Sequence, residues 1–150
     1  TSGLKLVIDY AHTAAALEHA LAALRPHVSG ELWCVFGCGG NRDQTKRPAM
    51  GEVAERLADH VILTDDNPRD ESPEGIVADI LSGMADAAGV RVIHDRDNAI
   101  TTAFREADAT DLVLIAGKGH ETTQERGGVR TAFSDAGVVR RLIGEGGEAA

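Results

Sequence analysis

Residues 32–43 read LWCVFGCGGNRD and carry the clearest signal of fold class in the chain. The first five residues are all apolar, as is typical of a strand that is buried on both faces of a parallel sheet. The strand leads directly into a loop with three glycines that ends in Asn41, Arg42 and Asp43. Such loops, at the carboxyl ends of buried strands, are where open α/β sheets bind their ligands.

Strands and helices alternate on both sides of this stretch. Four more short apolar runs predict strands at residues 4–8, 61–63, 90–93 and 112–116. The intervening segments have helical spacing, with candidate N-caps at Thr13, Ser72, Asp97 and Ser134 and first-turn prolines at Pro48 and Pro73. This alternation predicts a Rossmann-like, doubly wound α/β domain, with a mostly parallel sheet of about six strands and helices on both faces. Residues 129–133, which follow a Gly127-Gly128 turn, are a candidate antiparallel edge strand.

The length of 150 residues fits one domain with a core of its own. We expect the domain to cover residues 1–143, and the small, acidic residues 144–150 to form a disordered tail. The chain begins with Thr1 rather than methionine, so we expect it to have been processed, trimmed or excised from a longer protein.

The composition excludes some partners. A formal net charge of −9 argues against a nucleic-acid backbone or an anionic membrane surface, because both favour a basic face. No apolar run approaches the roughly 20 residues that a membrane-spanning helix needs. We interpret Cys34 and Cys38 as reduced thiols of a cytoplasmic protein, and two cysteines alone make a poor metal site. A small anionic ligand remains compatible with the charge.

Four polar or glycine-rich loops follow predicted strands, at residues 9–13, 37–43, 64–69 and 117–121. Because the carboxyl ends of parallel strands share one edge of the sheet, these loops are predicted to converge there. The resulting cleft would hold His12, Arg42, Arg69 and Lys118 together with the carboxylates Asp66 and Glu121. A cleft with both cationic and anionic groups suits a zwitterionic ligand such as an amino acid.

Each loop also has an interpretation without function. Gly37, Gly39 and Gly40 fit a tight turn with positive φ, and residues 65–68 fit an Asx-type turn at a helix start. Lys118 fits a solvated surface lysine, because Gly117-Lys118-Gly119 lacks the spacing and the Ser/Thr of a P-loop. Lys46-Arg47 is predicted to be a solvated basic pair. No nucleophile–base pair, complete ATP site or metal-ligand spacing is present, so a self-contained enzyme is not predicted.

The same loops resemble a known family. The C-terminal domain of the Mur ligases, and among them the ligases that add meso-diaminopimelate, has similar motifs in the same order: DYAHT at 9–13, FGCGGNRD at 36–43, KRPAMG at 46–51, TDDNPR at 64–69 and GKGHE at 117–121. Any one of these motifs would be a weak signal. Five in register, over nearly the whole chain, are a strong one.

The resemblance implies an ATP-dependent, amide-forming ligase of three domains, of which this chain is the third. In that reaction ATP phosphorylates the D-glutamate γ-carboxylate of UDP-MurNAc-L-Ala-D-Glu, and the amine of meso-diaminopimelate attacks the acyl phosphate. The cofactors implied are ATP and Mg²⁺, both bound mainly by the central domain. The isolated domain is therefore expected to be inactive, and neither nucleic acid nor membrane is an expected partner.

The resemblance also implies roles for individual residues. Those that match positions around meso-diaminopimelate are Arg42, Asp66, Asn67, Arg69, Gly117 and Glu121. Arg69 is expected to bind a carboxylate of the ligand, and Gly117 and Glu121 its distal amino group. Tyr10 and His12 match positions beside the nucleotide, and Lys118 is assigned to that side as well. No metal ligand is assigned to this chain.

The sequence departs from the family pattern at Ala14, Ala15, Asn41 and Thr123, where proline, aspartate, aspartate and tyrosine are usual. These departures bear on the nucleotide side and leave Asn67, Arg69, Gly117 and Glu121 untouched. The alternatives are the C-terminal domain of the L-lysine-adding ligase, of a folylpolyglutamate or cyanophycin synthetase, or a stand-alone module that binds an amino acid or nucleotide. The intact DNPR at residues 66–69 argues against the lysine-adding enzyme.

Overall fold

The computed structural model describes residues 3–145. A five-stranded parallel sheet is formed by β1 (Lys5–Asp9), β2 (Leu32–Phe36), β3 (His60–Leu63), β4 (Arg91–Val92) and β5 (Leu112–Ala116). The helices are α1 (Ala14–Leu24), α2 (Lys46–Leu57), α3 (Pro73–Leu81), α4 (Arg96–Glu106) and α5 (Asp135–Glu145), with single 3-10 turns at Arg25–His27 and Ala87–Gly89. The short strands β6 (Thr123–Arg126) and β7 (Val129–Ala132) form a separate hairpin. The predicted α/β class and the five predicted strands are confirmed.

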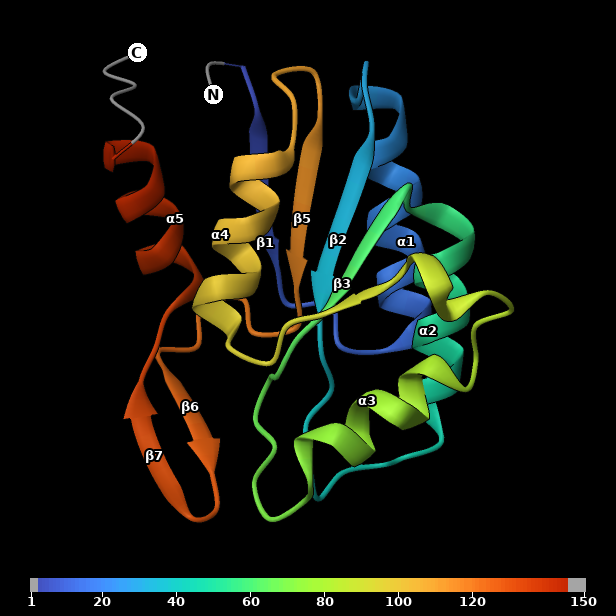
Figure 1. The fold of residues 1–150 in the computed structure, drawn as a ribbon, viewed down its shortest axis with the longest axis vertical. Helices are drawn as coiled ribbons and strands as arrows, with labels where there is room; N and C mark the ends of the chain where they lie inside the picture. The colour runs from blue at the N-terminus through green and yellow to red at the C-terminus, as the bar shows by residue number, and fades with distance from the viewer. Residues whose placement is uncertain (1–2, 146–150) are drawn as a thin grey trace.

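The strand order is β1-β5-β2-β3-β4, so β5 lies between the first two strands of the chain. Helices cover both faces of the sheet (Figure 1). Side chains alternate between two cores. Cys34 and Phe36 of β2 pack with α1, α2 and α3, whereas Trp33 and Val35 pack with α4 and α5. All residues of β2 and β5 are buried, which explains their continuous apolar sequences.

The candidate edge strand does not join the main sheet. Residues 129–132 instead pair antiparallel with residues 123–126, and the two strands are joined by Gly127 and Gly128 at φ 58° and 79°. Two consecutive residues with positive φ form the tight turn that suits a two-residue hairpin. β7 is exposed along its whole length and offers no apolar face to the main sheet. The hairpin therefore projects from the body of the domain (Figure 1).

Most of the predicted helix starts are confirmed. Thr13, Ser72 and Ser134 accept backbone N–H groups at the starts of α1, α3 and α5, and Pro48 and Pro73 lie in first turns. Asp97 is a correction, because α4 begins at Arg96 and Asp95 is its cap. Asp97 instead forms an ion pair of 2.7 Å with Arg141 of α5.

The predicted tail lies mostly outside the described residues. Helix α5 continues through Gly144 and Glu145, the first two residues assigned to the tail, and residues 146–150 are not described. Within residues 3–145, no helix has the length and apolar character needed to cross a membrane.

Candidate functional site

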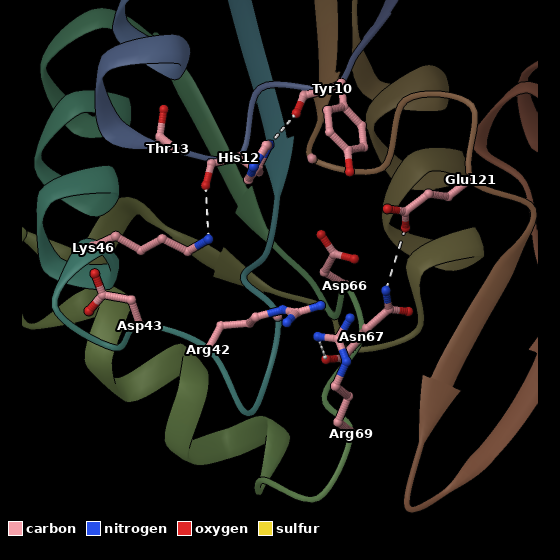
Figure 2. Close-up of a pocket in the computed structure, with 12 residues that line it drawn as sticks. Tyr10, His12, Thr13, Arg42, Asp43, Lys46, Asp66, Asn67, Arg69 and Glu121 are labelled. Carbon is pink, nitrogen blue, oxygen red and sulfur yellow. Dashed lines mark hydrogen bonds between the residues drawn. The ribbon is translucent and has the colours of Figure 1, made fainter.

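Loops from four strands meet at the carboxyl edge of the main sheet, as predicted. They follow β1, β2, β3 and β5, and together they surround a pocket of about 450 Å³, shown in Figure 2. The residues that line it are Tyr10, His12, Thr13, Gly39, Arg42, Asp43, Lys46, Asp66, Asn67, Arg69, Gly117 and Glu121. Eight of the nine predicted site residues are in this set, so the fold brings them together.

Lys118 is the exception. Its side chain is completely buried, so the solvated surface lysine of the functionless interpretation is wrong. Its assignment to the nucleotide side stays a prediction. Its ammonium instead approaches Asp66, Asn67 and Glu121 from the protein interior. The position next to two glycines gave no sign of this burial, because two of the four acceptors around the ammonium, on Asp66 and Asn67, lie on another loop.

The loop after β3, residues 64–69, is called the recognition loop below. Its two aspartates diverge: Asp66 faces the pocket, whereas Asp65 accepts hydrogen bonds of 2.7 Å from His94 and 2.8 Å from Arg126. Asp65 and these two partners line a second, smaller pocket of about 300 Å³. The interpretation of residues 65–68 as a simple Asx-type turn is therefore incomplete. The carboxylates of both aspartates contact residues from other parts of the chain.

Arg69 is held in a strained conformation. Its φ is 54°, in the left-handed region, which costs a residue with a side chain roughly 1–2 kcal/mol. The hairpin offsets this cost: the N–H of Arg69 donates to the carbonyl of Glu125 (3.0 Å), and its carbonyl accepts from the N–H of Gly127 (2.7 Å). The guanidinium donates to the carbonyl of Gly40 at 3.0 Å and lies 3.4 Å from the carboxylate of Glu125. Figure 2 shows Arg69 beside Arg42 at the pocket wall.

The glycine-rich loop after β2 packs directly on the recognition loop. A Cβ atom on Gly37 would lie 1.9 Å from the carbonyl oxygen of Thr64, and one on Gly40 would lie 1.8 Å from that of Pro68. Neither glycine has a positive φ, so the predicted tight-turn explanation is wrong for both. Glycine is required here because two backbones approach closely, with the N–H of Gly40 donating to the carbonyl of Asn67 at 2.7 Å.

Arg47 also corrects the sequence prediction. It is 1% exposed rather than solvated, and it donates to Glu71, to Asp79 and to the carbonyl of Gly39. The hydrogen bond with Glu71 raises the pKa of Arg47, and the same contact lowers the pKa of Glu71. Arg47 thereby fixes the glycine-rich loop to α3. Its neighbour Lys46 does line the pocket, where its Nζ donates to the carbonyl of His12 at 3.0 Å.

Tyr10 and His12 line the pocket across from Arg42 and Arg69 (Figure 2). Their rings meet edge to face at 4.8 Å, and the Nδ1 of His12 is 2.9 Å from the carbonyl of Tyr10. Tyr10 is 54% exposed, which leaves its ring available to a partner. Ala14 and Ala15, two of the departures from the family pattern, simply open α1 after its Thr13 cap.

Arg96 is a structural residue of the site that the sequence did not reveal. It is fully buried and forms a two-point ion pair with Asp135 of α5. It also donates to the carbonyl of Asp65, in the recognition loop, and to that of Ala116, the last residue of β5. Burial acts to lower the pKa of Arg96, but the hydrogen bonds and charge of Asp135 outweigh it and raise the pKa overall. The partner lies 39 residues away, so no local pattern could identify it.

The chemistry of the pocket is that of a binding site for a small ligand with both signs of charge. Arg42, Lys46 and Arg69 supply cations, and Asp43, Asp66 and Glu121 supply carboxylates. Among the described residues, no group of three or more His, Cys, Asp or Glu could hold a metal ion.

Comparisons with known proteins agree with this geometry. Residues 1–119 match the family model of the Mur ligase, glutamate ligase domain. The chain is similar to a solved UDP-N-acetylmuramoyl-L-alanyl-D-glutamate–2,6-diaminopimelate ligase, with 48% identity and a TM-score of 0.93. The similarity covers 99% of this chain but only 31% of that ligase.

Two folylpolyglutamate synthases share the fold at lower identity. The bifunctional folylpolyglutamate synthase/dihydrofolate synthase of Yersinia pestis, complexed with AMPPNP and Mn, is 20% identical with a TM-score of 0.58, over 75% of this chain and 25% of that one. The Mycobacterium tuberculosis enzyme, complexed with ADP and AMPPCP, is 20% identical with a TM-score of 0.56, over 93% and 29% of the two chains.

Proposed function

The chain belongs to the glutamate ligase domain family of the Mur ligases, and we propose that it binds meso-diaminopimelate for an ATP-dependent ligase that acts on UDP-MurNAc-L-Ala-D-Glu. The observation that carries this proposal is that two arginines and two carboxylates line the same pocket. Arg42 and Arg69 line it together with Asp66, which Figure 2 shows close to both, and Glu121.

The ligand's own chemistry fits this division. Meso-diaminopimelate carries an amino group and a carboxylate at each end, so its distal end needs both a cationic and an anionic partner. A guanidinium group can bind a carboxylate through two parallel hydrogen bonds, and Arg69 is held rigidly enough to present such a fork. L-lysine lacks the distal carboxylate, so it would not form these charge-assisted hydrogen bonds and should bind more weakly for that reason.

In the proposed reaction, this domain places the amine of the amino acid for attack on the acyl phosphate that ATP forms at the D-glutamate γ-carboxylate. The amide bond forms as phosphate leaves. Tyr10, His12 and Lys46, on the far side of the pocket, would complete the nucleotide site when the domains close. The described residues do not fit a Mg²⁺ site, so we assign the ion and most ATP contacts to other domains of the ligase.

Two further points belong to the same proposal. We expect the 150-residue chain alone to convert no ATP and UDP-MurNAc-dipeptide into tripeptide, because the phosphate-binding groups lie elsewhere. We also place the ligase in the cytoplasm, which is supported by two cysteines that remain free thiols. Burial raises the pKa of both Cys34 and Cys38 to about 12, so they are also unreactive in the folded protein.

The test is a titration of the isotopically labelled chain, followed by amide chemical shifts, with meso-diaminopimelate, L-lysine and ADP added separately. We expect meso-diaminopimelate to shift the amide signals of residues 42, 67, 69 and 117–121, and L-lysine to leave them unchanged. Arg69→Gln should raise the dissociation constant for meso-diaminopimelate at least tenfold. Arg105→Gln, a substitution of an exposed residue of α4, should leave it unchanged.

Other outcomes would point elsewhere. An equal response to L-lysine would favour the lysine-adding ligase and overturn the assignment of the amino acid. A response to ADP alone would favour a nucleotide-binding role, as in a folylpolyglutamate-type ligase or a stand-alone module. If none of the three ligands shifts any signal, the site forms only when the other domains close on it. The same titration would then be made on the complete ligase.

A further inference from the structure

The buried ammonium of Lys118 lies at the centre of the acidic side of the pocket. Its Nζ donates to the side-chain oxygen of Asn67 at 3.0 Å and to the carbonyl of Thr123 at 2.9 Å. One oxygen of Asp66 lies 3.3 Å away and one of Glu121 lies 3.4 Å away. Three of the proposed ligand-binding side chains therefore share a single internal partner.

We propose that Lys118 is a positioning residue, whose buried charge holds Asp66, Asn67 and Glu121 in the arrangement that receives the distal amino group of the ligand. This inference rests on the proposed function. An isolated ammonium would not remain in a buried position, because desolvation of an unpaired charge is very costly. The two carboxylates and the two neutral acceptors explain why this lysine is buried.

The first consequence concerns the charge of the pocket. Asp66 and Glu121 both approach the same nitrogen within 3.4 Å, and without a cation between them they would repel each other. With Lys118 in place, the three groups carry a net charge of −1. That charge matches one ammonium group of a ligand, and it is present before any ligand arrives.

The second consequence concerns the orientation of Asn67. Its Oδ1 accepts from both the Nζ of Lys118 at 3.0 Å and the N–H of Glu125 at 2.9 Å. An oxygen with two donors must be the acceptor end of the amide, so Nδ2 is the end that faces Glu121, at 3.5 Å. Lys118 and the hairpin thus select one of the two amide orientations and fix which group Asn67 offers to the pocket.

The departure at Thr123 agrees with this role. Lys118 uses the main-chain carbonyl of Thr123, which any residue at that position would supply. The side chain there is therefore free to vary without loss of the contact.

The experiment is steady-state kinetics of the complete ligase that carries this domain, with Lys118→Met, Lys118→Arg and, as a matched control, Lys5→Met. Lys5 lies at the opposite end of β1, where its Nζ donates to the carbonyl of His27. We expect Lys118→Met to raise KM for meso-diaminopimelate at least tenfold while KM for ATP changes less than twofold. Lys118→Arg should recover part of the loss, and Lys5→Met should match the unaltered enzyme.

A pH profile separates positioning from general loss of structure. In Lys118→Met, Asp66 and Glu121 lose the cation that contacts both of them, and the buried Arg96 remains as a charge that acts on both. One of the two carboxylates should therefore take up a proton more readily. We expect kcat/KM for meso-diaminopimelate to gain an ionisation that the unaltered enzyme lacks. An unchanged KM and pH profile in Lys118→Met would overturn the inference, and so would equal changes in the KM values of both substrates.

A measurement on the unaltered 150-residue chain covers the case in which the methionine variant does not fold. The chain has three lysines, Lys5, Lys46 and Lys118. With ¹⁵N-labelled lysine, we expect one ammonium signal protected from solvent exchange, since Lys118 alone of the three is fully buried. Absence of a protected ammonium signal would overturn the inference by itself. Failure of the unaltered ligase to use meso-diaminopimelate would instead overturn the proposed function, and this inference with it.

Discussion

Two residues at the contact between the glycine-rich loop and the recognition loop, Asn41 and Arg69, both adopt φ 54°. Asparagine tolerates this region better than most residues, and Asn41 also exchanges hydrogen bonds with Asp70. Its Nδ2 donates to the carboxylate of Asp70 at 3.1 Å, and its Oδ1 accepts from the N–H of Asp70 at 3.2 Å. The departure from the family's aspartate at position 41 is therefore matched to the aspartate at position 70.

This pairing predicts the effect of restoring the family residue. Asn41→Asp would replace a donor with a second carboxylate next to Asp70, and we expect a loss of about 1 kcal/mol in the free energy of unfolding. Urea denaturation at pH 7 measures it. Asn98→Asp is the matched control, since Asn98 is exposed in the first turn of α4, where negative charge is favourable. A stable Asn41→Asp protein would mean that the bond to Asp70 contributes nothing.

At the scale of elements, α2 and α3 pack closely through one glycine. A Cβ atom on Gly51 of α2 would lie 2.1 Å from the carbonyl oxygen of Ile80, which belongs to the backbone of α3 and cannot move aside. Gly75 of α3 has only ordinary contacts, with the nearest atom at 3.7 Å. The two helical glycines therefore serve different purposes.

We expect Gly51→Ala and Gly75→Ala to change stability in opposite directions. Gly51→Ala should cost about 1–3 kcal/mol because α2 and α3 must separate. Gly75→Ala should stabilise the protein by up to about 1 kcal/mol, because alanine is the better helix former. Thermal denaturation of both variants provides the measurement. If both alanines were tolerated equally, the close approach of the two helices would not be a constraint on stability.

Sequence patterns predicted the elements of the main sheet well, because buried parallel strands leave continuous apolar runs such as residues 32–36 and 112–116. They also predicted which loops converge, because strand direction alone places those loops on one edge. They did not predict the buried ion pairs. Arg47 is 24 residues from Glu71 and Lys118 is 51 residues from Asn67, so each looks like a solvated residue in its local sequence. Of the hairpin, the turn and β7 were predicted but β6 was not. β6 is polar and follows a motif that was assigned to binding.

At the scale of the whole molecule, several ion pairs join elements that are distant in sequence. Arg47 lowers the pKa of Glu71 below its ordinary value of 4.5, and Arg141 lowers the pKa of Asp97 below 3.8. Each carboxylate holds its proton less tightly in the folded state than in the unfolded state. Their contribution to stability is therefore complete above the ordinary pKa and is lost as the pH falls through it toward the folded value.

This linkage predicts acid sensitivity. We expect the free energy of unfolding to be steady from pH 7 to about pH 5 and to fall below about pH 4.5. Glu71→Gln should be less stable than the unaltered protein at pH 7, yet lose less on acidification. Urea denaturation at a series of pH values between 7 and 3 compares the two slopes. Parallel slopes would mean that Arg47 does not stabilise the charged form of Glu71.

The hairpin lies beyond residue 119, where the match to the family model ends, and it holds the recognition loop through main-chain atoms of Arg69 and Glu125. Bonds between backbone groups persist whatever side chains the two segments carry. The backbone conformation of residues 64–69 therefore does not depend on these two side chains. Point substitutions among residues 64–69 would therefore change the side chains that this segment presents to the pocket, while the backbone contacts that hold it remain.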